Sequence, residues 1–407
     1  NYAATHPWTL YEGVWQLDPA TIHRFDAEGW TGGEAYWRPR EPDPPAGADV
    51  RLHALAARLR DALRESVVSA TAEADRAAAL LSGGEDSRVV LAAVPEGVDV
   101  RGVVFAEWES REVRIARRVA RAHGATAARA TRSPDHYATG FPAASRLTGS
   151  GHLFVDVHGL GLATDPPLGA EPVVLGGLSA DSILKGGYAP EPVGRFRSKR
   201  PAGIRAELLD AVDERRNRAL DRMREWRPQS AEEWVWLWPF SMRKHSGNVE
   251  GNRRVFRSWE AFHAAGVLDV AAAAPLAWKR DRRLFRTAMR PLLRRTAWIP
   301  HTEYRFPYLG PWGNALALPG LAAARGARAL ATGECRVRHR PWPKWRALAA
   351  SDAMRAHEAA LSVAGTPLAA IFDRDDPAAV AAARAEWYAL RRLLLTQLAY
   401  VLRVHAG

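Results

Sequence analysis

The feature that most constrains this chain is the segment Leu81-Ser82-Gly83-Gly84-Glu85-Asp86-Ser87. It follows a short apolar run, residues 77–81, and precedes residues 87–93, which have the character of a helix. Two adjacent glycines let the backbone turn tightly and approach a ligand without a side-chain clash. Backbone N–H groups at the start of a helix attract phosphate. The segment therefore predicts a phosphate-binding loop at a strand-to-helix joint, and the alternative is a Gly-rich turn with a capping Asp or Ser.

Two common phosphate-binding loops are excluded by the residues of this segment. The Gly-Lys-Ser/Thr ending of a Walker loop is absent, and so is the Gly-x-Gly-x-x-Gly pattern of dinucleotide sites. Ser82 and Ser87 can donate hydroxyl hydrogens to a phosphate. Asp86 would repel a phosphate directly, but a carboxylate suits Mg²⁺, which bridges carboxylates and phosphate oxygens.

The order of predicted elements indicates an α/β fold. Expected strands at residues 77–81, 100–106, 125–130 and 172–175 alternate with expected helices at 52–72, 87–93 and 111–123. Alternation of this kind predicts an open, Rossmann-like parallel sheet with helices on both faces. From about residue 200 the chain is expected to be mainly helical, at 204–226, 230–242, 258–274, 282–294, 345–362 and 377–404.

The first 45 residues are predicted to form a small β segment. Residues 13–17 and 34–37 have strand character, and a proline-rich linker follows at 39–45. The predicted domains are thus residues 1–45 and residues 46–407, the second with a helical C-terminal part.

The amino-acid composition restricts the cellular compartment and the binding partners that we expect for this protein. The 407 residues contain one cysteine, Cys335, which excludes an intramolecular disulfide and fits a cytoplasmic location. No run of 18 apolar residues is present, so we expect no membrane span. The net charge of +12 is spread along the chain, apart from a cluster at 336–340. This charge indicates a solvated basic surface or an anionic partner, and we do not expect nucleic acid to be that partner.

The loop resembles a family signature. Ser-Gly-Gly-x-Asp-Ser is typical of ATP pyrophosphatases, which cleave ATP between the α and β phosphates; they include asparagine synthetase, β-lactam synthetase, lasso-peptide cyclase, argininosuccinate synthetase and tRNA lysidine synthetase. A second segment, residues 173–188, resembles the asparagine synthetase sequence Gly-Glu-Gly-Ala-Asp-Glu-x-x-Gly-Gly-Tyr. Tyr36-Trp37 before the linker resembles the end of the glutaminase domain in that family, although most of such a domain and its N-terminal Cys are absent from this sequence.

The resemblance implies the ATP-pyrophosphatase fold, with ATP and Mg²⁺ as cofactors. Asp86 and Asp181 would hold the metal. The nucleotide would contact the first loop, the end of the second strand and the second glycine-rich segment, through Leu81, Ser82, Gly83, Gly84, Asp86, Ser87, Phe105, Ala106, Gly176 and Gly177.

Departures from the family pattern indicate a divergent member. Ser179 and Ser182 replace a Gly and a Glu, Glu85 replaces a hydrophobic residue, and one extra residue, assigned to Lys185, precedes the closing glycines. Leu178 stands where β-lactam synthetases have a tyrosine. Residues 259–264 are nearest to Glu-x-Arg-x-Pro-Phe-Leu-Asp of asparagine synthetases but lack the Arg and Pro. Free aspartate is therefore not the expected substrate.

The implied reaction forms an acyl-adenylate, which an amine then attacks. This second step needs a base, and the candidates are Glu250 and Glu260, followed by His245 and His263. Each could instead be an ordinary ion-pair or core residue. Arg305 and Lys344 are candidates for a cation over the reacting centre, with a lysine between aromatic rings as the alternative for Lys344.

Four functions remain open at this point. The first is an AMP-forming amide synthetase acting on a natural-product or peptide carboxylate, with lasso-peptide cyclase as the leading specific hypothesis and a precursor peptide or biosynthetic protein as partner. The others are an ammonia-using relative of asparagine synthetase, a tRNA-modifying ATP pyrophosphatase, and an inactive partner-binding homologue.

Overall fold

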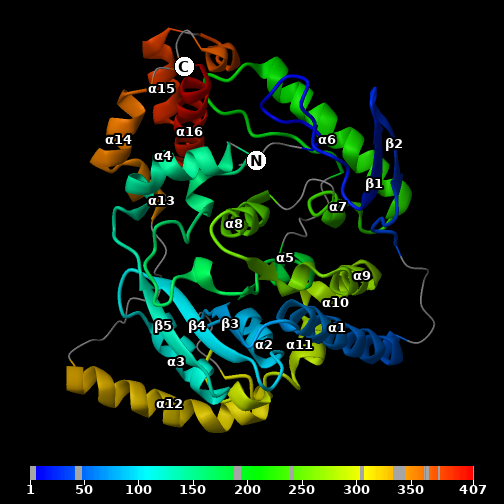
Figure 1. Ribbon diagram of the computed structural model, residues 1–407, viewed down its shortest axis with the longest axis vertical. Coiled ribbons are helices and arrows are strands. Elements are labelled where there is room, and N and C mark those ends of the chain that lie inside the picture. The colour runs from blue at the N-terminus through cyan, green and yellow to red at the C-terminus, as the bar shows by residue number, and fades with distance from the viewer. Residues whose placement is uncertain are drawn as a thin grey trace.

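A five-stranded parallel sheet organises the α/β part of the chain (Figure 1). The computed structural model describes residues 6–41, 48–149, 151–187, 194–238, 243–302, 307–332, 344–361, 363, 366–374 and 376–406. The strands lie in the order β5-β4-β3-β6-β7. Their bounds are β3 Arg76–Leu80, β4 Asp99–Ala106, β5 Thr126–Thr131, β6 Val174–Gly176 and β7 Ser258–Glu260. Each neighbouring pair is parallel, as predicted from the alternation of strands and helices.

The helices fall into those that join the strands and those that follow them. Up to β7 they are α1 Ala48–Thr71, α2 Glu85–Ala92, α3 Arg111–Ala122, α4 His136–Thr148, α5 Ala180–Ile183, α6 Ala206–Trp226, α7 Ala231–Trp234 and α8 Arg243–Arg253. After β7 they are α9 Ala265–Ala273, α10 Leu276–Arg280, α11 Arg283–Met289, α12 Gly310–Thr332, α13 Trp345–Ala349, α14 Asp352–Ala359, α15 Pro377–Ala385 and α16 Ala389–Ala406. None of these helices is long and apolar enough, within the described residues, to cross a membrane.

Strand β3 is buried on both faces of the sheet, to which its successive side chains point in turn. Ala77 and Ala79 of β3 join the largest hydrophobic core, which also contains residues of α1, α2, α3, α9 and α11. Ala78 joins a smaller cluster on the other face, with Leu168 and Phe256. Burial on both faces explains why this strand is a continuous apolar run instead of an alternating one.

A second core belongs to the C-terminal helices. Residues of α4, α13, α14, α15 and α16 share one hydrophobic cluster that is separate from the core beside the sheet. Phe141 of α4 packs against Phe154 with ring centroids 4.9 Å apart. Figure 1 shows these helices together at one end of the molecule, away from the sheet.

The strands of the N-terminal β segment are formed by other residues than predicted. Its strands are β1 Thr21–Asp26 and β2 Gly29–Ala35, paired antiparallel, so the strand predicted at 13–17 is wrong. Residues Trp8 and Trp15 form only an isolated bridge. Asp26 explains the shift: its carboxylate accepts the backbone N–H groups of Glu28 and Gly29 and so closes the hairpin turn. The linker predicted at 39–45 lies mostly outside the described residues, and the domain boundary stays a prediction.

Tertiary pairing overrides the helical prediction in one further place. The helix expected at 258–274 begins as strand β7, because Ser258–Glu260 pairs with β6. The helix expected at 230–242 is reduced to α7 and the turns after it, up to residue 238. Helix α12 was not predicted.

Candidate active site

The two predicted metal ligands meet at the point where the strand order reverses. From β3 the sheet extends to β4 and β5 on one side and to β6 and β7 on the other. Ligands of open parallel sheets bind in the crevice outside the carboxyl ends of the strands at such a point. Asp86 lies in the first turn of α2, after β3, and Asp181 lies in the first turn of α5, after β6. Neighbouring strands therefore bring together two residues that are far apart in the sequence.

The first loop is closed by its own hydroxyl groups. Ser82 Oγ accepts the Gly84 N–H at 3.1 Å, and Ser87 Oγ accepts the Ser82 N–H at 3.0 Å. The two hydroxyl oxygens lie 3.1 Å apart. A Cβ atom at Gly83 would lie 1.3 Å from Thr302 Oγ1, so glycine is required there by a distant segment. The serines thus shape the loop, in addition to any contact that they make with phosphate.

Arg88 is a site residue that the sequence reasoning missed. It is fully buried next to the loop, and its guanidinium donates hydrogen bonds to the carbonyl groups of Gly83, Thr296, Ile299 and Pro300. Burial lowers its pKa to about 10, so it stays protonated at neutral pH. A charged residue directly after the loop, followed by the apolar residues Val89, Val90 and Leu91, was the available signal.

One cation joins the carboxylates of the site. Lys185 Nζ lies 2.9 Å from Asp181 Oδ1 and 3.0 Å from Glu85 Oε1, and it also contacts Asp86 Oδ1. Burial raises the pKa of Asp86 to about 6, the Asp181 carboxylate also raises it, and Lys185 opposes both effects. Arg282 pairs with Glu85 from the other side. The sequence pattern marks Lys185 only as an inserted residue and therefore does not predict this arrangement.

The carboxylates of Asp86 and Asp181 suit a divalent cation that also binds oxygens of a ligand. Asp86 and Asp181 converge on one positively charged atom, which shows that their oxygens can reach a common cation. In the described part of the chain, no three His, Cys, Asp or Glu side chains are placed to hold a metal by themselves. Mg²⁺ commonly takes one or two carboxylates together with substrate phosphates. The residues present suit a metal whose coordination is completed by a nucleotide.

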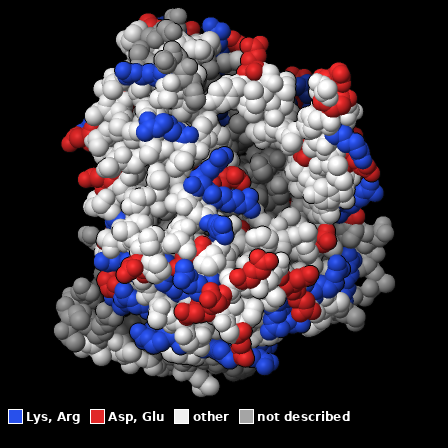
Figure 2. Space-filling model, in the orientation of Figure 1, with Lys and Arg blue, Asp and Glu red and all other residues white. Residues whose placement is uncertain are grey.

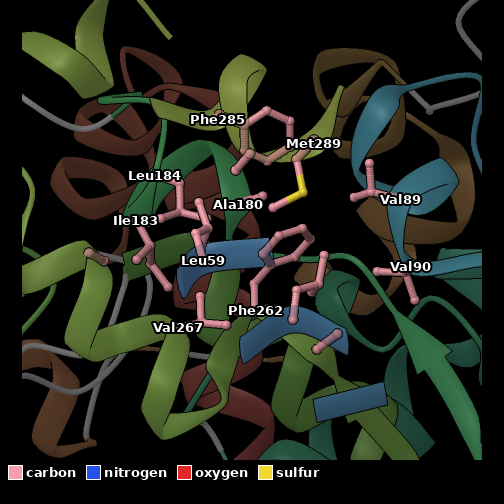
Figure 3. Close-up of a cluster of buried hydrophobic side chains, with 14 of the residues drawn as sticks. Leu59, Val89, Val90, Ala180, Ile183, Leu184, Phe262, Val267, Phe285 and Met289 are labelled. Carbon is pink, nitrogen blue, oxygen red and sulfur yellow. The ribbon is translucent and has the colours of Figure 1, made fainter. Parts of the chain in front are cut away.

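The helices that carry the two aspartates are anchored in the same core. Figure 3 shows Val89 and Val90 of α2 and Ile183 of α5 pointing into one cluster of buried side chains, together with Phe285 and Met289 of α11. All five are at most 1% exposed. Close packing resists displacement of either helix, so the separation of the carboxylates is set by the core.

The turn after β6 depends on close backbone approach. A Cβ atom at Gly176 would lie 2.2 Å from a Glu260 carboxylate oxygen, and one at Gly177 would lie 3.1 Å from the carbonyl carbon of Asp86. Ser179, which replaces a family glycine, has φ of +74°. Its Oγ lies 2.7 Å from Nε2 of His263. A hydrogen bond thus accompanies the left-handed backbone that a glycine would adopt without strain.

The predicted catalytic residues lie in different places. Glu260 is 3% exposed and accepts the Leu178 N–H at 2.9 Å, which places it beneath the turn after β6; burial raises its pKa. Glu250 lies on α8 and pairs with Arg253 at 3.3 Å. Lys344 is exposed immediately before α13. Arg305 and the side chain of His245 lie outside the described residues.

The remaining predicted nucleotide contacts lie at the ends of β3 and β4. Leu81 is buried, its N–H donates to the Val103 carbonyl at 2.8 Å, and its side chain packs against Gly102 in the sheet. The N–H group and the side chain of Leu81 are therefore both engaged within the sheet. Phe105 is half-buried at the end of β4, and Ala106 is fully buried.

Two titratable groups adjoin the loop of residues 81–87, the glycine loop. Glu112, in the first turn of α3, hydrogen bonds with the Gly83 backbone, and burial raises its pKa to about 7. Burial, followed by the charges of Arg88 and Arg282, lowers the pKa of His301 to about 4. At neutral pH His301 is thus uncharged, and the pKa of Glu112 lies much closer to neutrality than that of an ordinary glutamate.

A protein-family model matches the part of the chain that forms this site. The family model described as asparagine synthase matches residues 58–309. The matched stretch runs from α1 to the residue before α12 and includes Asp86, Lys185 and Asp181. It covers more than half of the chain. No curated protein matches the sequence.

Proposed function

The chain belongs to the asparagine synthase family of ATP-dependent amide-forming ligases, and we propose that it activates a carboxylate as an acyl-adenylate. In this reaction a carboxylate oxygen attacks the α-phosphorus of ATP, the bond to the bridging oxygen of the β-phosphate breaks, and pyrophosphate leaves. An amine nitrogen then attacks the acyl carbon and AMP leaves. The amine gives up a proton to a base.

The convergence of Asp86 and Asp181 on one cationic atom is the observation that carries this proposal. The first difficulty of the reaction is electrostatic, because one anion attacks another and negative charge grows on the departing pyrophosphate. Mg²⁺ bound between these carboxylates and the phosphates would neutralise part of that charge. The glycine loop lets the triphosphate approach the backbone, and Lys185 and Arg282 add fixed positive charge beside it.

We favour a peptide or other natural-product carboxylate over free aspartate as the substrate. The segment nearest to the aspartate-binding motif of asparagine synthetases lacks its arginine. Phe262 of this segment is fully buried in the core, and His263 is bonded to Ser179. Neither side chain offers a fixed cation to a free amino acid. A precursor peptide that is closed to a macrolactam, as in lasso peptides, is our specific candidate for the substrate.

The charge distribution on the face drawn in Figure 2 does not favour RNA as the substrate. Figure 2 shows Lys and Arg side chains interspersed with Asp and Glu among the described residues of one face, without a continuous basic stripe. Nucleic-acid sites usually gather basic residues on one face or groove.

The test is release of pyrophosphate and AMP from ATP. The protein is incubated with ATP, Mg²⁺ and one of three acceptor sets: a linear precursor peptide, aspartate with ammonia, or tRNA. We expect AMP and pyrophosphate in equal amounts with the peptide, and loss of both with Asp86→Asn. Asp352→Asn is the matched control, because Asp352 lies in the first turn of another helix, α14. Production of ADP and orthophosphate would refute adenylation, and turnover with aspartate or tRNA alone would refute the substrate class.

A further inference from the structure

Lys185 is surrounded by the carboxylates that the proposed metal would use. Its Nζ atom contacts Asp86 and lies 2.9 Å from Asp181 and 3.0 Å from Glu85. The lysine side chain is only 5% exposed. Both assigned metal ligands are therefore bound to the same ammonium group.

The backbone holds Lys185 in this place. Lys185 and Asp181 are four residues apart, and the Gly187 N–H donates to the Asp181 carbonyl at 2.8 Å, which closes the turn after α5. Gly186 has φ of +64°, a conformation that suits glycine. The ammonium lies 4.3 Å from the centre of the Phe285 ring, which walls the site on one side. The inserted residue is thus built into the fold with its charge facing inward.

The charges around this atom bear on metal affinity. Glu85, Asp86 and Asp181 supply three carboxylates, while Lys185 and Arg282 supply two cations. A divalent ion between Asp86 and Asp181 would stand within contact distance of the ammonium. Repulsion between like charges at that separation is large outside bulk water. Binding of either cation between Asp86 and Asp181 therefore weakens binding of the other.

We propose that Lys185 is a built-in competitor for the divalent cation. In the nucleotide-free protein its ammonium holds the Asp86 and Asp181 carboxylates and keeps affinity for a divalent cation low. A triphosphate changes this balance, because its oxygens give the metal further ligands and give Lys185 a new anionic partner. The metal thus binds together with the nucleotide. The nucleotide part rests on the proposed function, whereas the effect on metal affinity without nucleotide does not.

The test measures Mn²⁺ binding to nucleotide-free protein from the electron paramagnetic resonance signal of free Mn²⁺. Removal of the competing charge in Lys185→Met should tighten binding about tenfold or more. Lys185→Arg keeps a cation and should bind as weakly as the wild type. Lys199→Met, a change at an exposed lysine, is the control for lost net charge and should have no effect.

The Asp86 carboxylate provides the specificity check. The gain in Lys185→Met should disappear in Lys185→Met/Asp86→Asn, because the released carboxylate is gone. Equal Mn²⁺ affinity in the wild type and Lys185→Met, or a gain that survives Asp86→Asn, would overturn the proposal. Thermal melting confirms folding of each variant, and Lys185→Gln replaces Lys185→Met if the latter does not fold.

A second measurement separates this proposal from the proposed function. In the wild type, α,β-methylene-ATP should tighten Mn²⁺ binding about tenfold or more beyond the affinity of Mn²⁺ for the analogue alone. Wild-type Mn²⁺ affinity that is already high without the analogue would count against Lys185 as a competitor. If no variant binds the analogue, the nucleotide function fails, while the comparison of Lys185→Met with the wild type still decides the role of the lysine.

Discussion

The Arg88 guanidinium donates a 2.8 Å hydrogen bond to the carbonyl of Ile299, although the two residues are 211 positions apart. The same side chain donates to the Gly83 carbonyl at 3.1 Å. One buried cation therefore joins the glycine loop to the segment after α11. Residues from near both ends of the matched family region thus hold the loop in place. Its geometry depends on residues that lie outside the local motif.

Replacement of Arg88 should destabilise the protein and weaken ATP binding. Arg88→Met removes the donor to the carbonyl groups of Ile299 and Pro300, and each lost donor to a buried carbonyl costs about 1–3 kcal/mol. The carbonyl groups of Gly83 and Thr296 keep their backbone N–H donors. We expect a loss of about 3–5 kcal/mol in the free energy of unfolding, measured by urea denaturation. Arg88→Lys keeps the charge but cannot reach all the acceptors, so it should lie between Arg88→Met and the wild type. An unfolding midpoint unchanged in Arg88→Met would contradict this interpretation.

Replacement of Asp181 should impair catalysis while the fold persists. The Asp181 side chain is 70% exposed, so Asp181→Asn should change the free energy of unfolding by less than about 1 kcal/mol. Pyrophosphate release should fall roughly 10²- to 10³-fold, the usual cost of removing one electrostatic contact in a transition state. Activity near the wild-type level would remove Asp181 from the metal site.

Ser179 offers a test of backbone strain next to the site. Its φ of +74° costs about 1–2 kcal/mol for a residue with a Cβ atom, and glycine avoids that cost. Ser179→Ala and Ser179→Gly both lose the hydrogen bond to His263, but only alanine keeps the strain. We expect Ser179→Gly to be more stable than Ser179→Ala by about 1 kcal/mol in urea denaturation. The reverse order would show that the turn is not strained.

Glu112 should make stability depend on pH near neutrality. Burial raises its pKa from 4.5 to about 7, so the folded protein binds a proton more tightly than the unfolded chain. Its contribution to stability is complete below about pH 4 and is lost as the pH rises toward 7. Between pH 5 and 8 we expect Glu112 to account for about 1–2 kcal/mol, after allowance for its partial exposure to solvent.

Glu112→Gln is the matched variant for this pH dependence, because it keeps an oxygen that can accept the Gly83 N–H. Urea denaturation at pH 5, 6, 7 and 8 should give a flatter profile for the variant than for the wild type. Parallel profiles would show that Glu112 titrates normally.

The buried pair of Lys279 and Glu233 should be sensitive to loss of one partner. Lys279 Nζ lies 2.7 Å from Glu233 Oε1, and both side chains are at most 1% exposed. Lys279→Met leaves a buried carboxylate without its cation and should cost about 3–5 kcal/mol. The double variant Lys279→Met/Glu233→Gln removes both charges and should recover part of that loss. A single variant as stable as the wild type would rule out the pair as a determinant of stability.

Local patterns were sufficient to predict the α/β sheet and the glycine-rich turn between β3 and α2. Strands β3 and β6 are short apolar runs, and the glycines and Asp86 lie within one heptapeptide, so both patterns can be recognised without distant residues. The resemblance of the second segment also pointed to Asp181, whose role as a metal ligand stays a prediction. The match to the asparagine synthase family over residues 58–309 confirms the family that these two segments indicated.

Contacts between distant segments could not be derived in the same way. Strand β7 is three residues long and exists because β6 offers a parallel edge, so no periodic pattern marks it. Arg88 and Thr302 shape the loop through contacts across more than 200 residues. The sequence alone determined which chemical groups are available, because residue type and local spacing are written in it. Only the tertiary structure decided that Lys185 faces Asp86 and Asp181, because burial and packing choose which distant charges become neighbours.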